Sequence, residues 1–188
     1  MIPEEALQVV LSHFDECGIQ YMITGSFASN VHGVPRVTQD ADVVIEADLD
    51  RLLRFVNGLG EDFYADSDAA KEAFAGNRMV NIVHMPTGFK VDLVLRKERP
   101  FSKEEFQRRQ QVEFLGRRRW FTSAEDIILA KLEWSKMGQS ERQFRDAVSV
   151  AKVQRDALDR EYLKKWAEEL GVANLLEELF SSLDWESM

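Results

Sequence analysis

Two kinds of hydrophobic pattern divide the chain near residue 121. Before it, short apolar or alternating segments stand between amphipathic ones, which is typical of strands mixed with helices. From residue 122 onward, apolar positions recur at helical spacing. The pattern predicts an α/β (α+β) fold, with an α/β core over residues 1–121 and a C-terminal helical subdomain over residues 122–188 packed on that core. The expected strands are 21–24, 40–45, 79–85, 89–95, 112–115 and 118–121, and the expected helices are 3–17, 25–32, 48–59, 66–75, one from 102, one from 122, 142–154, 159–170 and 172–183.

Turn and capping residues sharpen three of these boundaries. Pro86-Thr87-Gly88 separates two strand-like runs and predicts a hairpin. Ser102-Lys103-Glu104-Glu105 and Thr122-Ser123-Ala124-Glu125 both have the form of a capping box, in which the first and fourth residues satisfy free N–H groups at a helix start. We therefore expect one helix to open at each of these two tetrapeptides.

The composition is that of an acidic globular protein. The 188 residues include 24 Lys and Arg against 33 Asp and Glu, so the formal net charge is −9. The single cysteine, Cys17, excludes an intrachain disulfide and fits a reducing compartment. No apolar run reaches the roughly 18 residues that a membrane span needs, and the acidic pair Glu4-Glu5 near the start is unlike a signal peptide. We expect a cytoplasmic protein without membrane association.

Positive charge gathers in one segment, residues 96–119. Nine basic residues stand there with four acidic ones, which gives the segment +5 and leaves −14 for the rest of the chain. One interpretation is a solvated surface on an ordinary helix and hairpin. The other is a strip that binds a polyphosphate or an RNA backbone, with the adjacent Trp120 stacking on a base.

Three short patterns in the first part of the chain contain residue types that bind phosphate and metal. Gly25-Ser26 follows a strand and opens a helix, where exposed N–H groups suit phosphate. Asp40 and Asp42 stand two apart in a strand, so both carboxylates lie on one face, and a divalent cation such as Mg²⁺ would offset their repulsion. Asp92 is an acid in an apolar strand, which is costly unless it is paired or binds metal. Each pattern by itself also fits ordinary turn or surface structure.

Taken together, the Gly25-Ser26 turn, Asp40-Ala41-Asp42 and the later Asp92 resemble the nucleotidyltransferase superfamily, which has the DNA polymerase β-like fold. Residues 36–42, Arg-Val-Thr-Gln-Asp-Ala-Asp, are similar to the corresponding line of small bacterial members. These members include AbiEii-type toxins and their relatives, and some aminoglycoside and lincosamide nucleotidyltransferases. The resemblance covers roughly residues 20–150 and implies a mixed β-sheet flanked by helices, followed by a C-terminal helical segment.

The resemblance also implies an activity, the transfer of an NMP group from an NTP to a hydroxyl with two Mg²⁺ ions. Asp40 and Asp42 would hold metal, and Asp92 would hold metal and act as the base toward the attacking hydroxyl. The residues that the resemblance assigns to nucleotide binding are Gly25, Ser26, Arg36, Thr38 and Lys131.

The helical part resembles the same branch at two places. Lys131 is similar to a lysine that reaches toward the nucleotide in small members, and Asp126 would cap or brace its helix. Residues 142–146, Arg-Gln-Phe-Arg-Asp, look like the R-x-x-K-D motif of AbiEii-type proteins, with arginine where lysine is usual. The alternatives are a solvent-exposed Lys131, and a charged cluster that only ties helices together.

The sequence thus supports two functional hypotheses. The leading one is a Mg²⁺-dependent nucleotidyltransferase of the EC 2.7.7 type, acting on RNA (tRNA in particular), a protein or a small molecule. It includes the hypothesis that the chain is the toxin of a toxin–antitoxin pair, with a cognate antitoxin as partner. The rival hypothesis is a non-catalytic protein of the same fold, either a nucleotide-binding sensor or the partner component of such a pair.

Overall fold

The chain forms two compact units, and the computed structural model describes residues 2–76 and 78–184. The first unit comprises Met1–Thr24 and Thr38–Phe121, and the second comprises Gly25–Val37 and Thr122–Met188. The short segment 25–37 therefore belongs to the helical unit, although the sequence pattern places it within the first 121 residues. The division of the chain into domains 1–121 and 122–188 stays a prediction.

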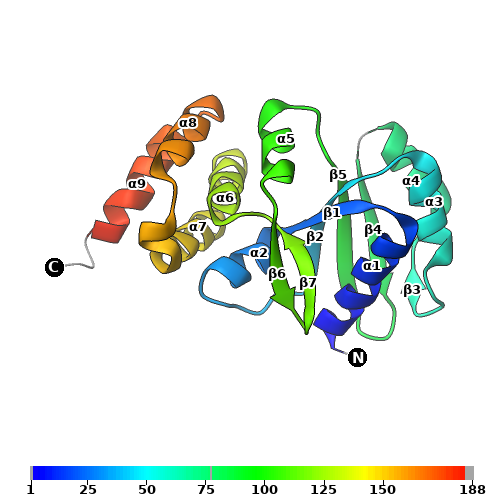
Figure 1. Ribbon diagram of the computed structural model, residues 1–188. Helices are drawn as coiled ribbons and strands as arrows, with labels where there is room; N and C mark the ends of the chain where they lie inside the picture. The colour runs from blue at the N-terminus through cyan, green and yellow to red at the C-terminus, as the bar shows by residue number, and fades with distance from the viewer. Residues whose placement is uncertain (1, 77, 185–188) are drawn as a thin grey trace. The chain divides into compact units, whose positions relative to one another are not determined.

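Within the described residues, seven strands of the first unit form one mixed sheet (Figure 1). Its order is β3-β4-β5-β2-β1-β7-β6. β2 is parallel to β5 and β1 is parallel to β7, while the other neighbouring strands are antiparallel. This arrangement confirms the expected mixed sheet. The strands are β1 (Gln20–Thr24), β2 (Asp40–Glu46), β3 (Phe63–Tyr64), β4 (Met79–His84), β5 (Phe89–Leu95), β6 (Gln110–Phe114) and β7 (Arg117–Phe121).

Helices α1 and α4 of the first unit contact the sheet, and α3 contacts both of these helices. Their packing shows which face of the sheet is buried. Phe14 of α1 stacks on Phe55 of α3 with ring centroids 4.4 Å apart, and it also contacts Tyr21 of β1 at 5.5 Å. The residues of β2 that point to the same side as Tyr21, including Val43 and Ile45, are fully buried. The alternate residues of β2 therefore lie on the opposite face. The helices of this unit are α1 (Pro3–Cys17), α3 (Leu49–Gly58), α4 (Ser67–Ala75) and α5 (Pro100–Gln107).

The start of α5 differs from its prediction. The helix begins at Pro100, and Arg99 occupies the N-cap position, so Ser102 lies inside the first turn instead of capping it. The Ser102 hydroxyl oxygen accepts a hydrogen bond from Arg99 Nε at 2.9 Å. The proline explains the earlier start, because its fixed φ suits the first helical turn and its missing N–H needs no partner there.

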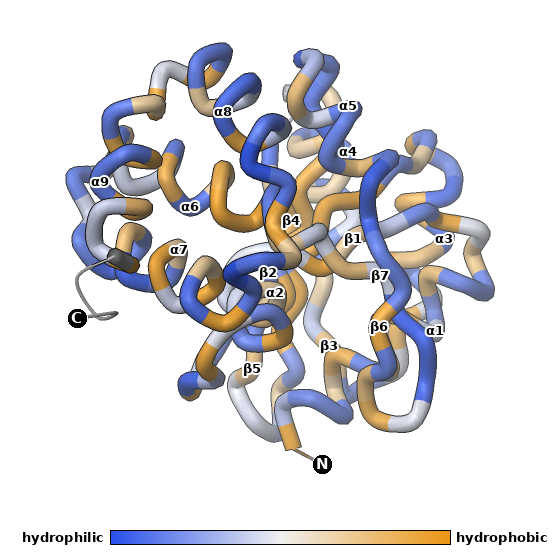
Figure 2. Tube along the Cα trace, turned by 60° about the vertical axis from the view of Figure 1, so that its left-hand side comes forward, coloured by the Kyte–Doolittle hydropathy of each residue, from blue (hydrophilic) through white to orange (hydrophobic). Residues whose placement is uncertain are grey.

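The second unit is helical, which confirms the predicted C-terminal helical segment, and α6 lies at its centre. This helix contacts α2, α7 and α8, and its residues Ile127, Ile128 and Leu132 are buried. Orange and blue alternate along the tube of α8 and α9, as expected for amphipathic helices that bury one side (Figure 2). The elements are α2 (Gly25–His32), α6 (Ala124–Gly138), α7 (Glu141–Gln154), the 3₁₀ turn η1 (Arg155–Ala157), α8 (Arg160–Glu169) and α9 (Ala173–Asp184).

The N-terminal cap of α6 lies one residue later than the predicted box. Ser123 is the N-cap, and its hydroxyl oxygen accepts from the backbone N–H of Asp126 at 3.2 Å. Asp126 is fully buried, and its carboxylate accepts from the Ser123 hydroxyl at 2.6 Å and from the Tyr162 hydroxyl at 2.5 Å. The cap is thus Ser123 with Asp126 in place of Thr122 with Glu125, and Asp126 braces α8 against α6. In the described residues, every helix is too short or too polar to traverse a bilayer.

Candidate active site

A row of polar side chains crosses the sheet of the first unit, on the face opposite to α1. Asp42 of β2 lies in register with Asp92 of the parallel strand β5 and with Thr24 of the antiparallel strand β1. Neighbouring strands lie about 4.8 Å apart, and residues in register point to the same side. The fold therefore places the carboxylates of Asp42 and Asp92 side by side, although 50 positions separate them in the chain.

The row continues onto β4, where Asn81 lies in register with Asp92. The side-chain amide of Asn81 donates a hydrogen bond from Nδ2 to Asp92 Oδ1 at 2.5 Å. This bond uses one of the two carboxylate oxygens of Asp92 and fixes the side chain in one orientation.

Asp40 lies on the same face, two residues before Asp42. Its carboxylate accepts a hydrogen bond from the Thr38 hydroxyl at 3.1 Å, and Lys90 of β5 is its register partner. Asp40, Asp42, Asp92 and Lys90 together carry a formal charge of −2. A divalent cation would offset that charge.

The donor set of this face suits Mg²⁺. In the described part of the chain, no group of three or more His, Cys, Asp or Glu side chains is close enough to hold a metal ion. Mg²⁺ usually binds through only one or two protein carboxylates and completes its shell with waters and substrate phosphates. Asp42 and Asp92 in register, with Asp40 beside them, fit that requirement.

In the second unit, a carboxylate joins two cations that come from different segments. Arg36 Nε donates to Asp146 Oδ1 at 3.0 Å, and Arg36 Nη2 donates to Asp146 Oδ2 at 2.8 Å. Lys131 Nζ donates to the same Oδ2 at 3.0 Å. Burial alone would raise the pKa of Asp146, but the hydrogen bonds and charges of Arg36 and Lys131 outweigh it, so the pKa lies below its usual value. Asp146 is therefore ionised at neutral pH, and the cluster has a net charge of +1.

The same cluster reaches the start of α2. Arg36 Nη2 also donates to the hydroxyl oxygen of Ser26 at 2.9 Å, and Ser26 is largely buried. The side chain of Asn30 makes two hydrogen bonds with the backbone of Arg36. Asn30 Nδ2 donates to the C=O at 2.6 Å, and Asn30 Oδ1 accepts from the N–H at 3.0 Å. Gly25 has a φ of +61°, a left-handed conformation that favours glycine at the junction between strand and helix.

These contacts decide one of the alternatives for the helical residues, that of a solvent-exposed Lys131. The Lys131 side chain is 5% exposed, so the solvent-exposed alternative is wrong. Of the motif over residues 142–146, Asp146 is buried in the cluster, whereas Arg142 and Arg145 are exposed. The structure therefore brings Ser26, Arg36 and Lys131 together in the second unit, around Asp146.

The chain matches no protein-family model and no curated protein. Among solved structures, it is similar to an antigenic nucleotidyltransferase-like protein from Paracoccidioides brasiliensis, with a TM-score of 0.57 and 18% identity over 95% of this chain and 92% of that chain. It is also similar to the antibiotic-resistance factor ANT(2'')-Ia, with a TM-score of 0.56 and 13% identity over 98% of this chain and 96% of that chain.

The chain has the nucleotidyltransferase fold. At these identities the likeness concerns the fold alone. The sequence prediction of the superfamily fold is confirmed. The roles predicted for individual site residues stay predictions.

Sequence reasoning missed Asn81 within this nucleotidyltransferase fold. A signal for it was present, because the hairpin turn at residues 86–88 fixes the register of β4 and β5. Once His84 pairs with Phe89, counting back three residues on β4 and forward three on β5 pairs Asn81 with Asp92. The side-chain hydrogen bond itself could not be read from the sequence.

The basic segment 96–119 is largely engaged in contacts within the first unit. Arg119 is 3% exposed and forms an ion pair with Asp15 at 2.6 Å between Arg119 Nη1 and Asp15 Oδ2. Arg96 pairs with Glu46 at 2.9 Å between Arg96 Nε and Glu46 Oε2. These contacts favour the interpretation of an ordinary surface over that of an anion-binding strip.

Trp120 has a similar internal partner. The guanidinium of Arg109 lies 4.9 Å from the centroid of the Trp120 ring and 4.3 Å from that of Phe106. Arg109 therefore covers part of the aromatic surface that was a candidate for stacking on a base.

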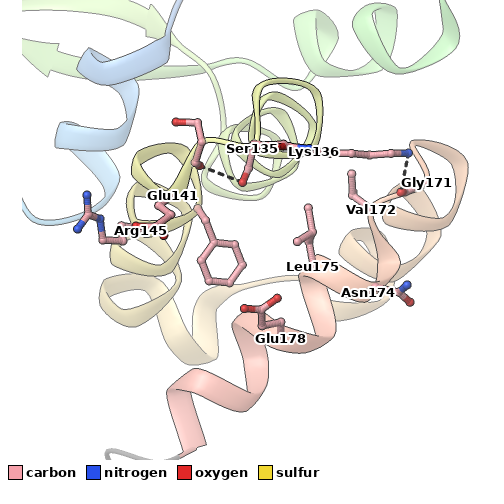
Figure 3. A pocket seen from close by; sticks show the side chains of 12 residues that line it. Ser135, Lys136, Glu141, Arg145, Gly171, Val172, Asn174, Leu175 and Glu178 are labelled. Carbon is pink, nitrogen blue, oxygen red and sulfur yellow. Dashed lines mark hydrogen bonds between the residues drawn. The ribbon is translucent and has the colours of Figure 1, made fainter.

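The second unit also contains a cleft of about 710 Å³ between α6, α7 and the start of α9 (Figure 3). Phe144 and Leu175 contribute apolar surface, and Glu178 lies on the α9 side. The two cations and two carboxylates of its lining cancel in charge, so the cleft favours neither an anion nor a cation. The charged lining residues are Lys136, Arg145, Glu141 and Glu178. Within the described residues, the cleft is lined by none of those predicted to bind metal or nucleotide.

Proposed function

We propose that this chain is a Mg²⁺-dependent nucleotidyltransferase that transfers an NMP group from an NTP to a hydroxyl acceptor. The observation that carries the proposal is the register of Asp42 with Asp92, on the sheet face that also holds Asp40. Carboxylates on adjacent strands of a nucleotidyltransferase fold are suited to a metal-bound triphosphate.

In the proposed reaction, the acceptor hydroxyl oxygen attacks the α-phosphorus of the NTP. A new P–O bond to the acceptor forms, the bond from the α-phosphorus to the bridging oxygen breaks, and pyrophosphate leaves. The hydroxyl proton passes to the carboxylate of Asp92. Asp40, Asp42 and Asp92 would hold Mg²⁺, which supplies charge neutralisation for the phosphates and acidifies a bound hydroxyl.

The remaining predicted residues have supporting roles in this proposal. The backbone N–H groups at Gly25 and Ser26 bind phosphate oxygens at the start of α2. Arg36 holds the Ser26 hydroxyl, and Lys131 neutralises Asp146 together with Arg36, so Arg36 and Lys131 are positioning residues. Thr38 orients the carboxylate of Asp40 through its hydroxyl.

A transfer assay tests the proposal. The full chain is incubated with labelled NTPs and Mg²⁺, in separate reactions with total RNA, proteins and small hydroxyl compounds. We expect Mg²⁺-dependent label transfer by the wild type and a loss of at least about 100-fold in Asp42→Ala, since the removed carboxylate is proposed to touch the metal. The control Glu61→Gln removes an exposed charge in the same unit and should retain full transfer.

This assay, together with a calorimetric titration of an NTP and Mg²⁺ into the full chain, separates the two hypotheses. Tight binding of an NTP with Mg²⁺ but no transfer to any acceptor class would overturn the enzyme proposal and support the nucleotide sensor. Neither binding nor transfer would refute the enzyme and the nucleotide sensor, and would favour the partner component of a toxin–antitoxin pair. Transfer to one acceptor class identifies that class as RNA, protein or small molecule.

The proposed toxin role rests on the resemblance to AbiEii-type proteins alone. It predicts that induced expression of the wild type arrests bacterial growth, and that Asp42→Ala relieves the arrest. Growth unaffected by the active wild type would contradict the toxin role and leave the transferase proposal intact.

A further inference from the structure

The carboxylate row in the first unit contains one amide, and its contact has a consequence for metal binding. Asn81 donates from Nδ2 to Asp92 Oδ1 at 2.5 Å, while Asp42 lies in register on the other side of Asp92. Asp92 thus has an N–H donor on one flank and a like charge on the other.

These two neighbours favour the same placement of the Asp92 carboxylate, with Oδ1 on the side of β4. Carboxylates on adjacent strands repel each other, and the repulsion favours rotamers that turn Asp92 away from Asp42. A hydrogen bond from an amide to a carboxylate is charge-assisted and directional, so it holds Oδ1 on the side of β4. With Oδ1 engaged on the side of β4, Oδ2 is the carboxylate oxygen through which Asp92 would bind a ligand shared with Asp42.

We propose that Asn81 is a positioning residue, which fixes Asp92 so that Oδ2 and the Asp42 carboxylate face one Mg²⁺. The inference rests on the proposed function and assigns a metal-organising role to a residue outside the carboxylate set. Partners that orient metal ligands typically affect metal affinity or activity by about 10- to 100-fold. Asn81 is exposed, so water competes with it for the hydrogen bond to Asp92. We therefore expect its removal to weaken metal binding by the lower end of that range.

The chain offers a matched series of variants for the test. Asn81→Leu keeps the approximate size of the side chain and removes the donor, whereas Asn81→Gln keeps an amide donor on a longer side chain. Met79 lies on the same strand and the same face but is in register with Val94, so Met79→Ala is the control for general damage to β4.

The measurement is a calorimetric titration of Mn²⁺, as a tighter-binding substitute for Mg²⁺, into each full-length variant with an unreactive NTP analogue present. We expect about 10-fold weaker Mn²⁺ binding for Asn81→Leu, with Asn81→Gln within about threefold of the wild type and Met79→Ala unchanged. In the transfer assay, Asn81→Leu should lower kcat while the KM for NTP changes by less than about threefold, because Asp92 is assigned to the attacking side.

Two results would overturn the inference while the proposed function stands: Asn81→Leu binding Mn²⁺ like the wild type, or Met79→Ala weakening binding as much as Asn81→Leu. If the wild type itself neither binds Mn²⁺ nor transfers label, the proposed function fails and this inference fails with it. Circular dichroism and the urea midpoint of each variant show whether the overall fold is retained.

Discussion

The charged cluster of the second unit yields a quantitative prediction for Asp146→Asn. The substitution keeps the size of the side chain and removes its charge, so it leaves no cavity. It places a neutral amide, with an N–H donor of its own, against the donors of Arg36 and Lys131. Two cations then lose the carboxylate that both of them contact.

The expected cost follows from the burial of the partners. Removing one member of a buried ion pair typically costs about 3–5 kcal/mol. Lys131 is 5% exposed and cannot regain water, whereas Arg36 is 31% exposed and can regain part of its hydration. We therefore expect Asp146→Asn to lower the free energy of unfolding by about 2–4 kcal/mol. Lys131→Met should cost less, about 1–2 kcal/mol, because both hydrogen bonds from Arg36 to Asp146 remain.

The pH dependence of this effect has a definite sign. The pKa of Asp146 is lower in the folded state than in the unfolded state, so its contribution is fully present above the unfolded value of about 3.9. It is lost as the pH falls through the folded pKa. The difference in stability between the wild type and Asp146→Asn should thus be constant near neutral pH and shrink below about pH 4.

Urea unfolding, followed by far-ultraviolet circular dichroism at several pH values, measures these differences. Asp156→Asn, which removes an exposed charge in the same unit, should change stability by less than about 0.5 kcal/mol. A cost below about 1 kcal/mol for Asp146→Asn, or a cost that does not decline at acid pH, would refute the argument that the ionised carboxylate stabilises this cluster.

Two further predictions concern the same unit. Burial lowers the pKa of His32, partly opposed by its hydrogen bond to the backbone C=O of Thr122 and by Glu125, so the folded state binds a proton less readily than the unfolded state. Stability should therefore fall as the pH drops below about 6.5, and His32→Gln should show a smaller drop between neutral pH and about pH 5 in urea unfolding. Gly25→Ala, at a φ of +61°, should cost about 1–2 kcal/mol, and an unchanged urea midpoint would contradict the left-handed conformation.

Much of the secondary structure followed from local patterns. The hairpin at residues 86–88, the alternation in β2 and the helical spacing after residue 122 depend on neighbouring residues, and each is present in the structure. The errors were also local. Pro100 starts α5 before the predicted cap, and Ser123 takes the cap position predicted for Thr122, because two adjacent hydroxyl residues compete for one role. The two-residue strand β3 (Phe63–Tyr64) was too short to show any periodicity.

The sequence by itself determined the residue types of the candidate site and the elements that hold them. Asp40 and Asp42 share a face because side chains in any strand alternate, and Gly25 stands where the backbone turns from strand to helix. These properties depend on backbone geometry over a few residues, so they can be read without knowing the fold.

Only the tertiary structure decided which of those residues meet. Asp92 joins Asp42 because β5 inserts beside β2 in parallel register, and Arg36 meets Asp146 across 110 positions of sequence. Strand order and helix packing are fixed by the burial of the whole core, a sum over many distant contacts that no local pattern contains. For the same reason, the burial of Lys131 and the bond from Asn81 to Asp92 became visible only in the folded molecule.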